Sequence, residues 1–264
     1  MFKKQQGATL IVVLLILIAI TTIGALAIRS STTQLQLITS AQAQQLMIQN
    51  SDAALFQFET PSDLERNMAL NGMFGFLKAE EDSGKELVFC YKAGDTQFFD
   101  LTKASLIHWD GNKVTNNGLS ELGFCKIDGG YFSTHRKTVM TQVAIKAADM
   151  SEAAAFQHMQ IGTDAETAKI DPAQLFTVVA TTIFPDVGKS VSDSSIADCF
   201  KNHFNAIPDA KAASLQSEIT DESSEDKKNE IRLAKLTVSQ CLIDLGVPTH
   251  TQVATYSLMQ NIGK

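Results

Sequence analysis

The stretch Lys3-Lys4-Gln5-Gln6-Gly7-Ala8-Thr9-Leu10-Ile11-Val12-Val13-Leu14-Leu15 opens the chain with two basic residues and an apolar run. The run continues to Ile28 without a charged residue, about 21 residues, which is long enough for an α-helix to cross a bilayer. The first charge after it is Arg29. Because positive charge favours the cytoplasmic side, the pattern predicts an N-in, C-out anchor at residues 8–28, with residues 30–264 outside.

A cleaved secretory signal is the first alternative for this stretch. Such signals have an apolar core of about 7 to 15 residues, followed by a cleavage site between small residues. The run here is longer, and it passes without proline into a glutamine-rich continuation, with Gly24 as its only internal glycine. Hydropathy alone therefore favours an uncleaved single-span anchor on an exported domain.

The order of charge, glycine and apolar helix around Gly7 and Ala8 resembles the leader of type IV prepilins, and the fuller string is similar to PilX-type minor pilins. The resemblance covers about residues 1–58. It implies that residues 1–7 are a leader, that a prepilin peptidase cuts the Gly7–Ala8 bond, and that the new N-terminus is methylated.

One position departs from the major-pilin pattern. Most pilins carry glutamate five residues after the cut, where this chain has Val12. In the family that glutamate is held to neutralise the N-terminus of a neighbouring subunit, and subunits without it are placed at the filament tip. PilX-type minor pilins and the K-type pseudopilins of type II secretion both lack it, so the resemblance implies a specialised tip subunit.

Residues 29–58 keep a helical period with a more polar composition. Apolar residues recur at intervals of three and seven, and glutamines with one aspartate occupy the opposite face (Ile38, Ala41, Ile48 and Leu55; Gln34, Gln42, Gln45, Gln49 and Asp52). This predicts an amphipathic helix half-buried against a globular domain; a juxtamembrane stalk is the alternative. Thr60-Pro61 should end it. Residues 8–58 thus predict one helix of about 50 residues, about 75 Å long.

The fold class that we predict is α+β: a pilin-like long N-terminal helix packed on a short antiparallel sheet, with a C-terminal helical insertion. Residues 59–185 should form the globular domain, with helices over 62–81 and 151–161. Its strands are expected between Gly- and Asn-rich turns, at Glu86–Tyr91, Gln97–Leu101, Ser105–Trp109, Leu122–Ile127, Thr138–Ile145 and Leu175–Phe184.

Residues 186–264 should form a C-terminal helical, disulfide-clamped region with an acidic loop. A helix is expected over 196–207, stopped by Pro208-Asp209, and helical order should return over 231–245 before the stop at Gly246-Val247-Pro248. The acidic stretch 217–230 is either a solvated helix start or a mobile loop. Residues 249–264 fit a short strand or a helix equally well.

The four cysteines are Cys90, Cys125, Cys199 and Cys241, and the predicted topology puts all of them in an oxidising compartment. Four cysteines allow three pairings. We favour Cys90–Cys125 and Cys199–Cys241, because the members of each pair fall in segments of like type and close the shortest sensible loops. No metal-ligand spacing is present, so no metal site is predicted.

Charge and motifs argue against two classes of function. The formal charge of -7 becomes -9 when Lys3 and Lys4 leave with the leader, which argues against non-specific nucleic-acid binding. No nucleophile elbow, zinc-protease motif, phosphate loop or dinucleotide fingerprint occurs, so we predict no enzyme and no cofactor. The closest approaches to a catalytic pair are His108 with Asp110 and Asp128 with His135, and residues this sparse occur by chance in any such domain. Calcium at residues 221–226 and ligand stacking on Trp109 are weaker alternatives to solvated charge and core packing.

The resemblance implies a structural role in a tip or priming complex that initiates type IV pilus assembly. Its partners would be other minor pilins, the major pilin, a PilY-type tip adhesin and the prepilin peptidase. The subunit would move from the inner membrane to the extracellular pilus tip. Small residues should let neighbouring anchor helices approach closely, and the expected packing positions are Val12, Gly24, Ala25 and Ala27. The alternatives are a K-type pseudopilin and a membrane-anchored receptor for DNA or a host ligand.

Overall fold

The computed structural model describes residues 8–59, 66–67, 69, 72–78, 84–92, 94–95, 99–127, 138–148, 174–185, 191–220 and 223–258. By contact density the chain divides into two compact units, residues 1–45 and 46–264. The predicted leader, with Gly7, lies outside the described residues. The helix predicted over 151–161 also lies outside them, as does half of the range 62–81, in which the structure has a short helix, α3 (Met73–Lys78).

The N-terminal helix, α1, runs from Ala8 to Phe56, and one 3-10 turn, η1 (Gln57–Glu59), follows it. The apolar face begins later than predicted. Ile38 is 52% exposed and Ala41 is also exposed, whereas Met47, Ala54 and Leu55 are buried. The prediction of a half-buried helix from residue 29 onward was therefore wrong for its first part, and the packed face belongs to the unit that begins at residue 46.

The second unit is built on a six-stranded antiparallel sheet with the order β3-β2-β1-β4-β5-β6. The strands are β1 (Glu86–Tyr91), β2 (Ser105–Asp110), β3 (Lys113–Thr115), β4 (Met140–Ala147), β5 (Gln174–Ile183) and β6 (Thr249–Leu258). All six residues of β1 are buried, because both faces of the sheet are covered. The predicted α+β class with an antiparallel sheet is confirmed.

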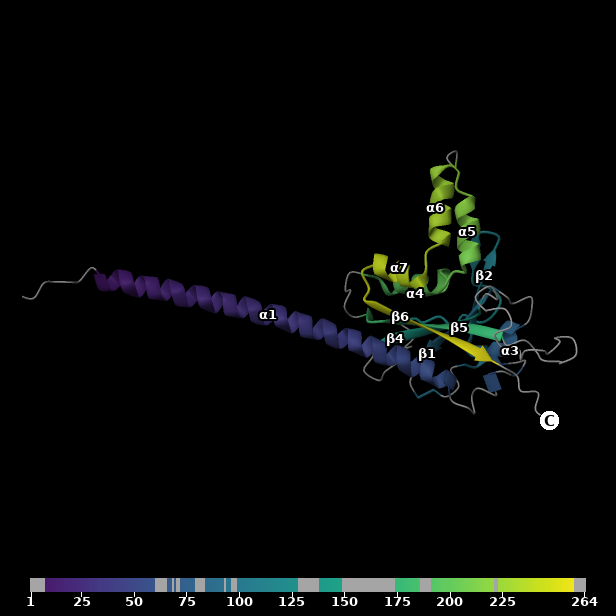
Figure 1. The fold of residues 1–264 in the computed structure, drawn as a ribbon, viewed down its shortest axis with the longest axis horizontal. Coiled ribbons are helices and arrows are strands. Elements are labelled where there is room, and N and C mark those ends of the chain that lie inside the picture. Colours follow the sequence, from purple (N-terminus) through teal and green to yellow (C-terminus); the bar gives the residue numbers. More distant parts are fainter. Residues whose placement is uncertain are drawn as a thin grey trace, which may run out of the picture. The chain divides into compact units, whose positions relative to one another are not determined.

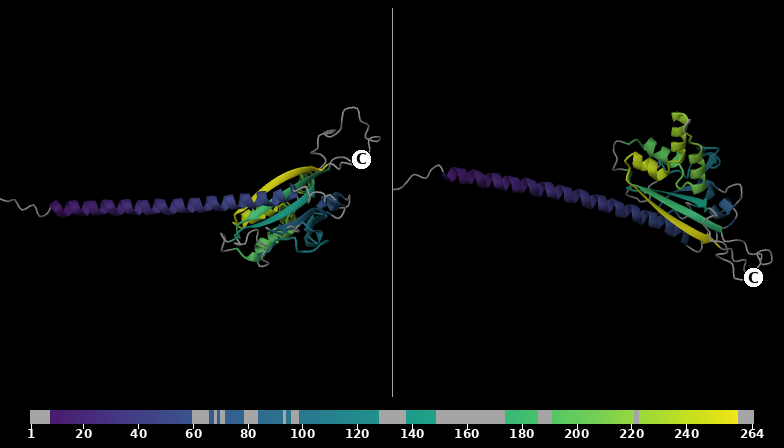
Figure 2. Two further views of the ribbon diagram at one scale, coloured as in Figure 1. Left: turned by 90° about the horizontal axis from the view of Figure 1, so that it is seen from below. Right: turned by 45° about the horizontal axis from the view of Figure 1, so that its top comes forward.

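The two faces of the sheet carry separate cores, and the C-terminal helices cover the face opposite the end of α1 (Figure 2). Alternation along β1 directs Leu87 and Phe89 to the face that packs on the end of α1 and on α3. Val88 and Cys90 face the opposite way, into the cores that the C-terminal helices complete. The sheet is therefore the middle layer of a three-layer unit.

In the described part of the insertion between β5 and β6 there are four helices (Figure 1). They are α4 (Asp193–Asn202), α5 (Asp209–Ser217), α6 (Glu225–Ala234) and α7 (Val238–Asp244). The side chains of Ser192, Ser224 and Thr237 cap α4, α6 and α7 by accepting backbone N–H bonds, which is why these helices start where they do. Gly246, at φ 75°, follows α7, as the predicted stop signal requires.

Several predicted helix limits in this insertion were wrong. The helix expected to reach Ile207 ends at Asn202, because His203 is extended and Phe204 forms a parallel bridge with Thr237. Pro208 does not only stop a helix; it is the N-cap residue of α5. The helix expected over 231–245 is divided between α6 and α7. The acidic stretch includes the start of α6, with Asp221 and Glu222 outside the described residues.

Two predicted strands were also wrong. The strand expected at Gln97–Leu101 is absent from its described residues, 99–101. Asp100 instead accepts a hydrogen bond from the Thr102 amide and caps the 3-10 turn η3 (Leu101–Lys103). The segment Leu122–Ile127 forms no strand, because the N–H groups of Gly123 and Cys125 bond to side chains of the sheet rather than to a neighbouring strand. The short strand β3 was not predicted.

The tail, which the sequence did not assign, contributes β6. All ten residues of β6 pair with β5. The predicted boundary at residue 185 therefore does not separate two structural units, because the chain returns to the same sheet after the insertion.

Candidate functional site

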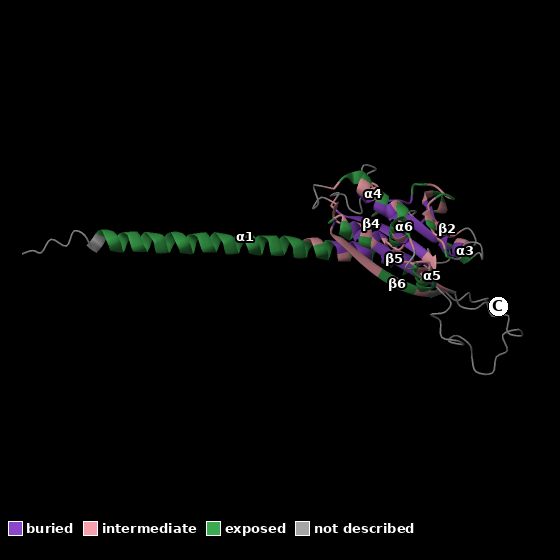
Figure 3. Ribbon diagram, turned by 90° about the horizontal axis from the view of Figure 1, so that it is seen from above, coloured by how far each residue is buried: buried purple, intermediate pink, exposed green. Residues whose placement is uncertain are grey.

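The exposed part of α1 is the first candidate site. All large apolar side chains between Leu10 and Ile28 are exposed (Figure 3). Their exposed fractions range from 49% at Ile18 to 72% at Leu10. A long helix this apolar is compatible with a membrane anchor by length and composition. Such a surface would be costly in water and is compatible with lipid or neighbouring helices around it.

The predicted packing residues lie on this exposed surface but do not share one narrow stripe. Val12 is 53% exposed, and a Cβ added to Gly24 would meet nothing within 4 Å. Ala25 and Ala27 are exposed as well. At about 100° per residue these four positions spread over more than half of the helix circumference. They suit a helix with neighbours on several sides. Ala8 begins α1, and its side chain lies outside the described residues.

The base of α1 is joined to the sheet by a buried face. Met47, Ser51 and Leu55 are spaced by one turn and are all buried. The Ser51 Oγ lies 2.8 Å from Thr182 Oγ1, which lies 2.9 Å from Thr141 Oγ1, so a chain of hydroxyls links α1 to β5 and β4. Sequence reasoning missed Ser51, although its spacing from Met47 and Leu55 was a usable signal.

Aromatic rings complete this junction. Phe58, 1% exposed, has its ring centroid 4.2 Å from that of Phe99 and 6.1 Å from those of Phe74 and Tyr256. At the rim, Gln252 Nε2 donates to Asp52 Oδ1 at 2.8 Å. The last turns of α1 are therefore part of the hydrophobic core of the second unit, and a force on this end of the helix would act on the sheet directly.

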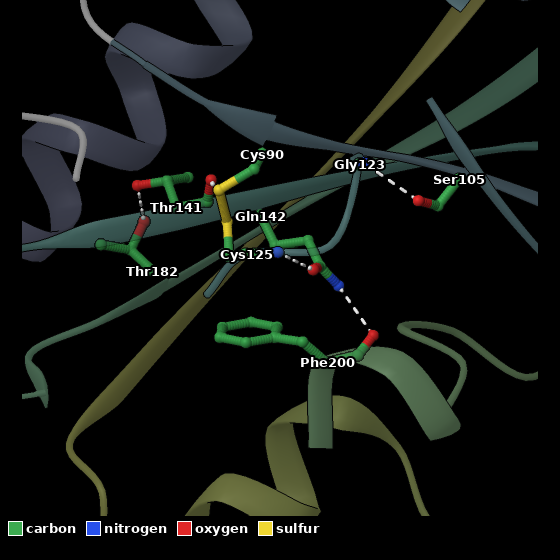
Figure 4. Close-up of a disulfide and its surroundings, with 8 residues drawn as sticks. All are labelled: Cys90, Ser105, Gly123, Cys125, Thr141, Gln142, Thr182 and Phe200. Atoms are coloured by element: carbon green, nitrogen blue, oxygen red, sulfur yellow. Dashed lines mark hydrogen bonds between the residues drawn. A yellow bond between two sulfur atoms is a disulfide. The ribbon is translucent and has the colours of Figure 1, made fainter. Parts of the chain in front are cut away.

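The first disulfide joins Cys90 on β1 to Cys125, with a Cα–Cα distance of 5.0 Å (Figure 4). It is one of the two pairings that the sequence favoured, but it does not join two strands. The irregular segment 123–125 lies against the sheet so closely that a Cβ on Gly123 would meet Val88 O at 2.1 Å. Gly123 N–H donates to Ser105 Oγ at 2.9 Å.

A buried glutamine connects this disulfide to the insertion. Gln142 on β4 accepts from the Cys125 amide at 3.2 Å and donates to the Phe200 carbonyl at 3.2 Å (Figure 4). Its side chain is fully buried. One side chain thus satisfies polar groups of the irregular segment and of α4 at the same time.

The second disulfide, Cys199–Cys241, clamps α4 to α7 with a Cα–Cα distance of 5.6 Å and is the other favoured pairing. It lies in a core with Ile196, Phe200 and Leu242. The helices α5 and α6 lie between these cysteines in sequence. The clamp therefore closes the base of the insertion and leaves the α5–α6 hairpin as its projecting part (Figure 1).

Glu86 is a buried acid at the junction of sheet and insertion, and sequence reasoning did not single it out. Its carboxylate accepts from the Asn205 amide N–H, from Asn205 Nδ2 and from the Ala206 amide N–H, at 2.9, 3.1 and 2.9 Å. Burial raises the pKa of this carboxyl, and the three hydrogen bonds oppose that shift. The Lys146 ammonium also lies near and donates to the Ala206 carbonyl at 3.2 Å.

Trp109 is partly buried. Its ring is stacked on Phe204 with a centroid distance of 4.8 Å and an interplanar angle of 8°, and Lys211 Nζ lies 5.0 Å from its centroid. These contacts explain the position of the Trp109 ring by packing between β2 and the insertion.

The sequence predicts no catalytic residues, and only one of the two His–Asp combinations named above lies in the described part of the chain. His108 and Asp110 lie on β2, whereas Asp128 and His135 lie outside the described residues. Within the described part of the chain no group of three or more His, Cys, Asp or Glu side chains could hold a metal ion.

Comparison of the chain with protein-family models, with curated proteins and with solved structures found no match.

Proposed function

We propose that this chain is a minor pilin of the PilX type, which joins a priming complex that initiates type IV pilus assembly at the tip. The observation that supports this most is the single helix Ala8–Phe56. Its first half offers an exposed apolar surface, and its last turns belong to the core of an antiparallel sheet. A subunit that leaves a membrane and enters a filament needs both properties in one helix.

The two parts of α1 suggest how the subunit would pass from the membrane into a filament. In the bilayer, the apolar side chains of residues 8–28 contact lipid; in the filament, they exchange lipid for neighbouring anchor helices. The exchange is favoured by close approach at small residues such as Gly24 and Ala27 rather than by a hydrophobic effect, because both environments are apolar. The buried Ser51 junction then makes the sheet follow the helix.

The same proposal gives the location and the partners. The prepilin peptidase cuts after Gly7 while the chain is anchored N-in, C-out in the inner membrane. The mature subunit then joins other minor pilins and the major pilin. It presents a PilY-type adhesin at the extracellular tip, where the absence of an acid at Val12 restricts it.

The intact mass of the protein, recovered from membranes with and without the prepilin peptidase, tests the proposal. We expect the peptidase to remove residues 1–7 and to add one methyl group to the Ala8 amine. A Gly7→Leu variant should remain unprocessed. A Gly24→Leu variant is the matched control, because a side chain at Gly24 meets no neighbouring atom in the structure and the cleavage site is unchanged.

An unprocessed N-terminus in both strains would make residues 8–28 an ordinary anchor, and the filament proposal would be wrong. Processing, together with genes for a secretion system rather than a pilus beside the gene for this chain, would favour the K-type pseudopilin instead. Salt-dependent DNA binding by residues 30–264 would favour the receptor.

A further inference from the structure

A lysine, an asparagine and a buried acid meet where the insertion packs on the sheet. Glu86 lies on β1, and Lys146 lies on the neighbouring strand β4. Each is two residues from a member of the pair Val88↔Ala144, which lies in the core on the insertion face. Because side chains alternate along a strand, Glu86 and Lys146 point to that same face. Asn205, which follows α4, is 7% exposed and completes the group.

The side-chain amide of Asn205 is held at both of its polar atoms. Its Nδ2 donates to Glu86 Oε2 at 3.1 Å, and its Oδ1 accepts from the Thr181 hydroxyl at 3.4 Å. A donor at the amide oxygen stabilises the negative charge that develops there when a nucleophile adds to Cγ. An acid beside the amide nitrogen can protonate that nitrogen as it leaves. This amide therefore has the surroundings that acyl transfer requires.

Lys146 brings a nucleophile to the same segment. Its Nζ donates to the carbonyl oxygen of Ala206, the residue after Asn205, at 3.2 Å. A lysine amine attacks a carbonyl carbon only after it has lost a proton. Burial raises the pKa of Glu86, and the Lys146 charge opposes that shift, so the two groups lie close enough to influence each other. Transfer of a proton from Lys146 to Glu86 removes both charges from a site that water reaches poorly.

We propose that Lys146 and Asn205 form an intramolecular isopeptide bond, with Glu86 as the acid–base group. The Lys146 ammonium gives a proton to the Glu86 carboxylate, and Nζ moves from the Ala206 carbonyl to Asn205 Cγ. The Nζ–Cγ bond forms and the Cγ–Nδ2 bond breaks. Glu86 passes its proton to Nδ2, removes one more from Nζ and releases it to the departing ammonia. An ammonium group and a carboxamide thus give a secondary amide and one ammonium ion, and nothing is oxidised or reduced.

A second group of the same three residue types shows why burial matters. Lys211 Nζ lies 3.3 Å from Asn112 Oδ1, and Asn112 Nδ2 donates to Glu218 Oε1 at 2.7 Å. The Glu218 side chain is 36% exposed, whereas Glu86 is 1% exposed. Water stabilises the charges of the exposed group, so proton transfer from its lysine to its acid gains nothing from burial. Of these two groups, only the buried one is expected to react.

Mass spectrometry of the full chain, purified in detergent, tests the bond. We expect an intact mass lower by one ammonia molecule than the mass of the sequence with two disulfides. After reduction and digestion with trypsin, the peptide 202–211 should stay joined through Asn205 to the peptide that contains Lys146. Lys146→Arg keeps a charged donor but lacks the amine, and Glu86→Gln keeps the shape but carries no proton. Both variants should show no loss of ammonia.

Lys211→Arg is the matched control and should keep the loss, because it changes only the exposed group. Formation of the Cys199–Cys241 disulfide shows that each variant has folded. Three results would overturn the proposal: no loss of ammonia in the wild type, a loss that persists in Lys146→Arg or Glu86→Gln, or a joined peptide that contains Lys211 in place of Lys146. The digest reads the bond whether or not residues 1–7 are removed, so this proposal and the proposed function fail separately.

Discussion

At the scale of single residues, Glu86 shows how one buried acid organises two elements. It fixes the backbone of Asn205 and Ala206, at the exit from α4, against β1. The three donors around it compensate in part for the lost hydration of its charge. The balance still favours the protonated form more than water does, since burial is the largest influence on its pKa.

This balance predicts a pH dependence of stability. Because the folded pKa of Glu86 lies above its ordinary value of 4.5, its contribution is largest below that value and falls as pH rises toward the folded pKa. The free energy of unfolding of the wild type minus that of Glu86→Gln should therefore decrease from pH 4 to pH 7. Denaturant titrations in micelles, followed by the fluorescence of Trp109, would measure it.

Glu121 supplies a control of opposite sign. A hydrogen bond and the charge of Lys201 lower the pKa of this exposed carboxyl. Its contribution should be present above the ordinary pKa and lost as pH falls. A Glu121→Gln variant with the same pH trend as Glu86→Gln would contradict our account of burial.

Gly123 carries a steric prediction. Replacing Gly123 with alanine would put a Cβ 2.1 Å from Val88 O and 2.4 Å from Ser105 N, so β1 or β2 would have to move. We expect a loss of about 2–5 kcal/mol in the free energy of unfolding and slower formation of Cys90–Cys125. Gly24→Ala should have almost no effect on unfolding of the sheet. Equal stability of the two variants would show that segment 123–125 can move away.

At the scale of elements, the Cys199–Cys241 disulfide explains how the short helices α4 and α7 are stabilised. α7 has seven residues and α4 has ten, lengths that are marginal in water without tertiary contacts. Cys199–Cys241 holds them together across a separation of 42 residues. The core around Phe200 and Leu242 then has a fixed geometry in which to pack.

Removing this disulfide should loosen the insertion before the sheet. Cys199→Ala with Cys241→Ala should lower the free energy of unfolding by about 2–4 kcal/mol. Hydrogen exchange should quicken in α5, α6 and α7 while β1, β4 and β5 keep their protection. Equal loss of protection in sheet and insertion would mean that the two unfold as one unit.

The sequence predicted those elements whose signals are local. β1 was located to the residue because a β-branched and aromatic run ends at turn signals, and β4 and β5 were located to within two residues. The segment around Gly123 failed because its backbone partners are the side chains of Ser105 and Gln142, which no local pattern reveals. Glu86 was missed for the same reason, since its partners lie more than a hundred residues away.

At the scale of the whole molecule, the residue at position 12 should decide where the subunit sits. On our proposal that the chain is a minor pilin, Val12→Glu supplies the acid that most pilins carry at this position, and we expect the subunit to spread along the pilus shaft. Val13→Glu is the control, because it carries the same charge into the membrane about 100° away on the helix. Immunogold labelling of sheared pili would compare them. A tip location for both variants would contradict the role of Val12.

The insertion between β5 and β6 also sets the order in which the chain can fold during synthesis. Synthesis from the N-terminus delivers β5 well before β6, since 65 residues separate Ile183 from Thr249. Until β6 arrives, the edge of β5 that pairs with it stays open to other chains. Oxidation of Cys199 and Cys241 shortens the free tether between the two strands to about 24 residues and lowers the entropic cost of closing it by about 1 kcal/mol. Thiol oxidation before the last strand arrives thus shortens the period in which the half-built sheet is open to aggregation.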